Sequence, residues 1–284
     1  MRDLQKRKQK CQSMESQMRD RSRFHLAESD PHPLEVVGER YRGQFFLTCE
    51  HAGRAIPSCL GDLGIGRREM DRHIAYDVGA EEVSRKLSDL LSAPLYIQRY
   101  SRLVIDCNRP ARASDSIPEM SDGTVIPKNI GLCPQDREER YLLIHRPYHD
   151  AVKEALGRFV MLNGEPILLA IHSFTPVMRS TGEAREYELG LLYNRDDRFA
   201  RAMLEVVNLS YPEIKAALNV PYTVDDLSDY TIPVHGEARG IPHVLIEIRN
   251  DLISNQAGQS RWADIISQTA RAAAVRMELM TNEL

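Results

Sequence analysis

Two histidines, His51 and His172, each come after a run of apolar residues that predicts a buried β-strand. His172 ends the run 167–171, and His51 follows the run 45–49 after a single glutamate, Glu50. Ligands of open α/β sheets bind at the carboxyl ends of the strands, so both imidazoles are expected at one sheet edge. Two neutral imidazoles and one carboxylate are a typical zinc ligand set with a fourth position left for water. The sequence therefore predicts a metal site there, and a histidine that merely ends a strand is the simpler alternative.

Two other apolar runs lead to side chains that can bind a substrate or move a proton. Residues 103–105 form a run that Asn108 and Arg109 follow, and Glu247 stands between two isoleucines of a later run. A glutamate is costly to bury in an apolar strand unless it is paired, protonated or close to a metal. Glu247 is thus a candidate for proton transfer, and a surface ion pair with Arg249 is the alternative.

Apolar patterning predicts the elements that must position these residues. Strands are expected at 45–49, 95–97, 103–105, 167–171, 189–193, 222–224 and 244–251. Helices are expected after Asp77, where Val83, Leu87, Leu90 and Leu91 share one face, and at 136–162, 196–207 and 260–280. This alternation indicates an α/β fold with a central mixed β-sheet flanked by helices on both faces. The stretch 111–134 has no period and is expected to be a long loop.

The length of the chain limits the number of domains, and its net charge limits the classes of binding partner. The chain has 284 residues, 27% of them charged, with a formal net charge of -4. We expect a charged, flexible extension over residues 1–33 and a single catalytic α/β domain over residues 34–284. The acidic balance disfavours nucleic acid and membranes as partners, and no signal peptide or transmembrane segment is expected. The 5 cysteines lack C-x-x-C spacing, which favours a reducing cytoplasm over a disulfide framework.

His145 and His149 have a spacing that places two imidazoles on one face of a helix. Pro147 lies between them and disfavours a regular helical turn at this point. We therefore expect hydrogen-bonded histidines of the core rather than a second metal site. Cys49 and Cys107, which lie close to the candidate site residues in the sequence, are expected to be small buried packing residues.

Five segments occur in an order that resembles the N-formylglutamate amidohydrolase family. They are FLTCEHA (46–52), DRHIAYDVGA (71–80), SRLVIDCNR (101–109), HSF (172–174) and IEIRN (246–250). The resemblance covers residues 44–251. That family is similar to the zinc carboxypeptidases, so the resemblance implies a phosphorylase/hydrolase-like α/β fold.

The resemblance also implies roles for single residues. His51 and His172 would bind zinc, Glu247 would be the general acid and base, and Asn108 and Arg109 would bind the substrate carboxylate. Arg109 would also act in catalysis by positioning that carboxylate.

Other positions complete the predicted site. Arg102 would help Arg109, and Ser173 and Arg249 are expected among the substrate-binding residues. The carboxypeptidases' H-x-x-E pair is missing, because Arg54 stands three residues after the first histidine. The third metal ligand must come from elsewhere, and Asp77 is preferred over Glu50.

The resemblance therefore implies a zinc-dependent hydrolase of the amide bond in an N-acyl, above all N-formyl, acidic amino acid such as N-formylglutamate. Zinc would activate water, and a separate carboxylate would pass the proton to the leaving amine. The same chemistry on another N-acyl amino acid or on a peptide's carboxyl end is one alternative. A metal-free module that holds a carboxylate ligand with Arg102 and Arg109 is the other.

Overall fold

The structure is a computed structural model that describes residues 24–282. Residues 1–23, which form most of the predicted flexible extension, lie outside the described part. Within residues 24–282, no helix combines the length and the apolar character that a membrane crossing requires.

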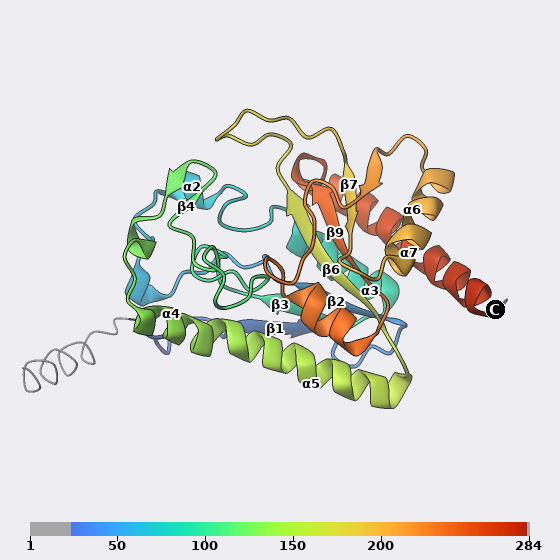
Figure 1. The fold of residues 1–284 in the computed structure, drawn as a ribbon, viewed down its shortest axis with the longest axis horizontal. Coiled ribbons are helices and arrows are strands. Elements are labelled where there is room, and N and C mark those ends of the chain that lie inside the picture. Colours follow the sequence, from blue (N-terminus) through green and yellow to red (C-terminus); the bar gives the residue numbers. More distant parts are fainter. Residues whose placement is uncertain (1–23, 283–284) are drawn as a thin grey trace, which may run out of the picture.

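A seven-stranded mixed β-sheet forms the centre of the molecule (Figure 1). The strand order is β1-β3-β2-β6-β9-β7-β8. Strands β3, β2, β6 and β9 run parallel to one another, whereas β1 pairs antiparallel with β3 and β7 pairs antiparallel with β9. The strands are β1 (Leu34–Val37), β2 (Phe45–Cys49), β3 (Leu95–Gln98), β6 (Ile167–Phe174), β7 (Leu189–Leu192), β8 (Ala216–Leu218) and β9 (His243–Arg249). The predicted α/β fold with a mixed sheet is confirmed.

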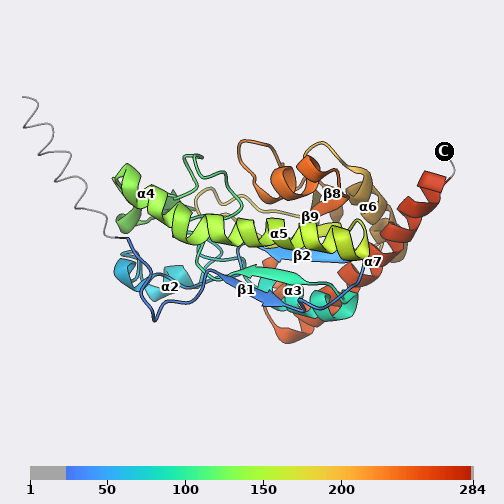
Figure 2. The same ribbon diagram turned by 90° about the horizontal axis from the view of Figure 1, so that it is seen from below.

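Helices cover both faces of this sheet, as the sequence predicts (Figures 1 and 2). One face packs on α3 (Ala80–Leu91), α6 (Arg198–Ser210) and α7 (Gln256–Asn282). The other face packs on α5 (Arg146–Asn163), which α4 (Pro134–Arg140) precedes. Successive side chains of β2 point to opposite faces of the sheet, so Phe45 packs in the core on the first face and Phe46 in the core on the second.

Several shorter elements complete the fold, one of them within the predicted loop. The predicted loop 111–134 contains a hairpin of β4 (Met120–Ser121) and β5 (Thr124–Val125). Helix α2 (Arg67–Met70) lies near this hairpin in Figure 1. There are also two π-helical turns: Tyr141–His145 joins α4 to α5 within the predicted helix 136–162, and Ile232–Gly236 lies in the segment before β9. The long segment after β6 runs toward the hairpin, where Asp122 accepts hydrogen bonds from the backbone of Arg179 and Ser180.

Three local predictions are wrong. Residues 103–105 are buried but form a turn, because the side chains of Asn129 and Arg140 bind the carbonyls of Leu103 and Val104, which an adjacent strand would otherwise bind. Residues 222–224 are not a strand, and the edge strand β8 lies earlier in the chain. Leu90 is 42% exposed, so it does not share the buried face of α3.

Candidate metal centre

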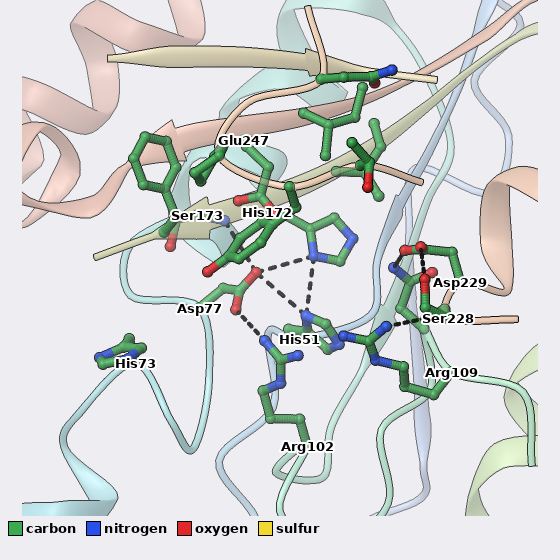
Figure 3. Close-up of a pocket in the computed structure, with 18 of the residues that line it drawn as sticks. His51, His73, Asp77, Arg102, Arg109, His172, Ser173, Ser228, Asp229 and Glu247 are labelled. Carbon is green, nitrogen blue, oxygen red and sulfur yellow. Dashed lines mark hydrogen bonds and ion pairs between the residues drawn. The ribbon is translucent and has the colours of Figure 1, made fainter. Parts of the chain in front are cut away.

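The candidate site lies at the carboxyl-terminal edge of the parallel strands, on the sheet face that packs on α5. His172 of β6 and Glu247 of β9 are direct partners in the strand register. β6 continues to Phe174, so His172 lies within the strand and not after its end. Both side chains line a pocket of about 630 Å³, shown in Figure 3, together with His51 from the loop after β2.

His51, Asp77 and His172 place one ligand atom each within 4.8 Å of one another. The Nδ1 atom of His172 lies 3.1 Å from Nδ1 of His51 and 3.0 Å from Oδ2 of Asp77. All three residues are at most 3% exposed. The structure therefore brings together the two predicted histidines and the preferred carboxylate, and this donor set fits zinc.

A carboxylate lies behind each imidazole. Nε2 of His51 is 2.6 Å from Oδ1 of Asp106, and Nε2 of His172 is 3.0 Å from Oε2 of Glu50. These partners assign the ring proton to Nε2, which leaves the Nδ1 lone pairs directed at the space beside Asp77. Glu50 thus orients His172, and the geometry favours Asp77 as the third ligand.

Glu50 is held by two further contacts. Its Oε1 atom accepts hydrogen bonds from Oγ1 of Thr231 at 2.8 Å and from the hydroxyl of Tyr148 on α5 at 3.4 Å. Burial alone would raise the pKa of Glu50, but its contacts with His172 and Thr231 outweigh burial and lower the pKa. Glu50 therefore stays ionised and can fix the imidazole of His172.

Asp106 is a site residue that the sequence analysis missed. Arg102 binds it through Nη2 at 2.7 Å and Nε at 3.1 Å, and reaches Oδ1 of Asp77 through Nη1 at 3.3 Å. Burial opposes ionisation, yet Arg102 and His51 hold the pKa of Asp106 well below its usual range. Arg102, predicted as a substrate contact, lines the pocket but is bound to two aspartates of the site. The signal for Asp106 was its place between apolar residues of a segment that the family pattern includes.

Glu247 is 7% exposed, and its Oε2 atom has no hydrogen-bond partner among the described residues. Burial raises the pKa of Glu247 to about 7. The alternative of a surface pair with Arg249 is wrong, because Arg249 binds Asp251 with an Nε–Oδ1 distance of 2.8 Å. Arg249, a predicted substrate contact, is not among the residues that line the pocket.

Asn108 and Arg109 reach the pocket from a turn and not from the end of a strand. Asn108 accepts a hydrogen bond from the backbone of Thr231 at 3.1 Å and donates one to Asp229 at 3.1 Å. Arg109 donates to the carbonyl of Ser228. The two residues therefore tie the turn to segment 228–231, which forms one wall of the pocket.

Ser173 lines the pocket and also supports the ligand set. Its backbone N–H donates to Oδ2 of Asp77 at 3.0 Å, and its hydroxyl donates to the carbonyl of Val78 at 2.9 Å. These bonds fix the turn that carries Asp77 against β6. The predicted role of Ser173 in substrate binding stays a prediction.

The position of another wall of the pocket, segment 219–223, depends on a glycine. Gly190 of β7 faces Glu247 in the strand register. A Cβ atom at position 190 would lie 1.7 Å from the carbonyl oxygen of Val220, so only glycine permits this contact. The segment 219–223 therefore lies directly on the sheet beside Glu247.

His145 and His149 are buried and hydrogen-bonded, as the sequence predicts. Nε2 of His149 is 2.6 Å from the carbonyl oxygen of Cys107, and Nε2 of His145 is 2.9 Å from that of Arg109. Nδ1 of His149 lies 3.0 Å from Nε2 of His235, so a third histidine ring joins this buried group. Among the described residues, these histidines do not form a metal-like group.

The two cysteines near the site are also as predicted. Cys49 and Cys107 are both buried, and burial raises the pKa of each thiol. A protonated, buried thiol is a packing residue and not a nucleophile.

Comparisons with known proteins identify the family of this chain. The family model of N-formylglutamate amidohydrolase matches residues 43–254. The solved structure of gene product Atu2144 from Agrobacterium tumefaciens is 35% identical and covers 89% of this chain and 99% of its own, with a TM-score of 0.85. The N-formylglutamate amidohydrolase from Ralstonia eutropha JMP134 shares the fold at 18% identity and a TM-score of 0.62, covering 86% of this chain and 98% of its own. No curated protein matches the sequence. The chain belongs to the N-formylglutamate amidohydrolase family.

Proposed function

We propose that this protein hydrolyses the amide bond of an N-acyl amino acid with the help of a zinc ion bound by His51, Asp77 and His172. Amidohydrolase activity follows from the family, and N-formylglutamate is the substrate that the family's description names. One observation carries the proposal: Glu247, a buried glutamate whose Oε2 atom has no hydrogen-bond partner among the described residues, lies beside a cluster of two histidines and an aspartate.

The cluster fits zinc in donor type and in its surroundings. Its two imidazoles and one carboxylate converge, and Asp106 and Glu50 orient the rings from behind. When bound, zinc would polarise the acyl carbonyl and lower the pKa of a water molecule to about 7.

Glu247 is the residue that moves the proton. Its pKa of about 7 lets the carboxylate accept a proton from water and return it near neutral pH. The oxygen of water bonds to the acyl carbon, the carbon–nitrogen bond breaks, and the proton held on Glu247 passes to the leaving nitrogen. The products are a carboxylic acid and a free amino acid.

Arg109 is the residue that we assign to the substrate carboxylate. Its side chain lines the pocket and is 27% exposed, so the guanidinium can reach a ligand. A guanidinium binds a carboxylate through directed, charge-assisted hydrogen bonds. These bonds would hold the amide at a fixed distance from Glu247.

The test is a zinc-loaded assay with a panel of N-formyl, N-acetyl and N-succinyl amino acids, run together with metal analysis. We expect stoichiometric zinc and release of free amino acid from at least one substrate class. A purified protein that takes up no zinc and hydrolyses none of them would be a metal-free binding module instead.

A further inference from the structure

Within the proposed function, on which this inference rests, we infer that the substrate's amino-acid side chain is uncharged. An N-acyl glutamate carries two carboxylates, one on the α-carbon and one on the side chain. The pocket of this chain offers a cationic partner to only one of them. Outside the histidines of the candidate metal cluster, the basic side chains that line the pocket are those of Arg102, Arg109 and His73.

Among the described residues that line the pocket, Arg102 and Arg109 are the arginines, and there is no lysine. Arg102 contacts both Asp106, at 2.7 Å, and Asp77, at 3.3 Å. Its single positive charge already faces two negative charges. A substrate carboxylate placed beside Arg102 would have to compete with both aspartates.

Arg109 can serve one carboxylate. Its Nη1 atom donates to the carbonyl of Ser228, and its Nε atom lies 3.3 Å from Asp115. Its Nη2 atom makes no hydrogen bond or ion pair within residues 24–282. This outer nitrogen is the donor that the α-carboxylate would take.

His73 also lines the pocket but adds no positive charge near neutral pH. Burial lowers its pKa, and the opposing effect of Asp122, 3.5 Å away, does not reverse the shift. Figure 3 shows Arg102 and Arg109 together on one side of the histidine cluster and Glu247 on the other. The cationic groups are therefore confined to one part of the pocket.

The remaining wall is neutral or acidic. Segment 219–223, held on the sheet by Gly190, contributes Asn219, Tyr222 and Thr223 to the lining. Asp229 lies on the other wall. A side-chain carboxylate there would lose its hydration without gaining an opposite charge, which disfavours it against an uncharged isostere.

A third arginine, Arg185, contacts this wall but is not among the residues that line the pocket. Its Nη1 atom donates to the hydroxyl of Tyr222 at 2.7 Å, and its guanidinium lies over the ring of Tyr222 at 4.7 Å from the centroid. The guanidinium of Arg185 is therefore already engaged by Tyr222. The pocket of about 630 Å³ also leaves room for a neutral side chain larger than that of glutamate.

The experiment compares N-formylglutamine with N-formylglutamate on the zinc-loaded, full-length enzyme. The two side chains are nearly isosteric, and only that of glutamate is charged. N-formylmethionine and N-formyllysine complete the panel. We expect kcat/KM for the glutamine substrate to exceed that for the glutamate substrate by about tenfold or more. A preference for glutamate or lysine overturns this inference and leaves the proposed function intact. If neither these substrates nor the N-acetyl and N-succinyl amino acids of the wider panel are hydrolysed, both are overturned.

A gain of charge tests the same wall directly. Thr223 is an exposed residue of the lining, so Thr223→Arg places a cation on the neutral side. We expect this variant to lower the ratio of glutamine to glutamate kcat/KM about tenfold, whereas the uncharged Thr223→Gln keeps the wild-type ratio. Equal ratios in the two variants would overturn the assignment of this wall to the side chain.

Discussion

His172 and Glu247 lie directly opposite each other on the hydrogen-bonded strands β6 and β9. A candidate metal ligand and the candidate acid–base residue are thus fixed by the register of two central strands and do not depend on a loop. Sites on strands hold their side chains more precisely than sites on loops do. The arrangement is suited to moving a proton over a short, constant distance.

Glu247→Gln removes the ionisable group and keeps the size of the side chain. We expect kcat to fall by about 10²- to 10⁴-fold, because general acid–base catalysis contributes an effect of this size. Zinc content measured by mass spectrometry is expected to stay at the wild-type value. Full activity of this variant would show that another group moves the proton.

Asp106→Asn weakens the carboxylate that orients His51. We expect the affinity for zinc to fall about 10- to 100-fold, as is usual when such a partner of a ligating histidine is changed. Competition with a zinc chelator gives the dissociation constant. Asp251→Asn is the matched control, since Asp251 is exposed and pairs with Arg249 outside the pocket. Equal zinc affinity in both variants would argue against the orienting role of Asp106.

Arg109→Gln removes the proposed partner of the α-carboxylate. We expect KM for N-formyl amino acids to rise about 10- to 100-fold, the range for the loss of hydrogen bonds to a charged group. The corresponding N-formyl amino acid amides lack this carboxylate, so steady-state kinetics should show a much smaller change for them. A similar rise in KM for acids and amides would indicate a general disturbance of the wall.

His235 gives the folded protein a pH-dependent stability. Burial, assisted by the charge of Arg239, lowers the pKa of His235 to about 4 in the folded protein, against about 6.5 in an unfolded chain. Between these values the unfolded chain binds more protons, so this contribution is complete above pH 6.5 and is lost as the pH falls toward 4. The loss from this group is about 3 kcal/mol.

Urea unfolding at several pH values between 4 and 8 measures this effect. His235→Gln should flatten the fall in the free energy of unfolding below pH 6.5. His25→Gln, at an exposed histidine, is the control and should keep the wild-type pH dependence. An unchanged pH dependence in the His235 variant would contradict the assignment.

The parts of the fold that could be predicted are those with a long apolar period. The central run at 167–171 and the amphipathic segment at 260–280 each bury apolar residues in a regular pattern, and both elements are present. Residues 103–105 have the same composition as a strand, but their carbonyls are satisfied by side chains from distant segments. A local pattern carries no information about such partners.

The candidate site also has residues that the sequence predicts and residues whose role only the fold reveals. His51, Asp77 and His172 could be found because their types suit a metal and because family motifs surround them. The orienting role of Glu50 was not predicted, since a carboxylate beside a histidine in sequence reads equally well as a ligand. The ring that it orients lies 122 positions away, and only the folded sheet brings the two together. The roles of the candidate site residues in binding zinc and substrate stay predictions.

Position 190 is sterically closed to substitution. Every replacement of glycine adds at least a Cβ atom, and that atom would collide with the carbonyl of Val220. The backbone path beside β7 therefore requires glycine at this position, whereas the side chain of Thr223 is exposed and can be exchanged. An engineered change of substrate range would therefore exchange the side chain at position 223 and leave the path of the backbone as it is.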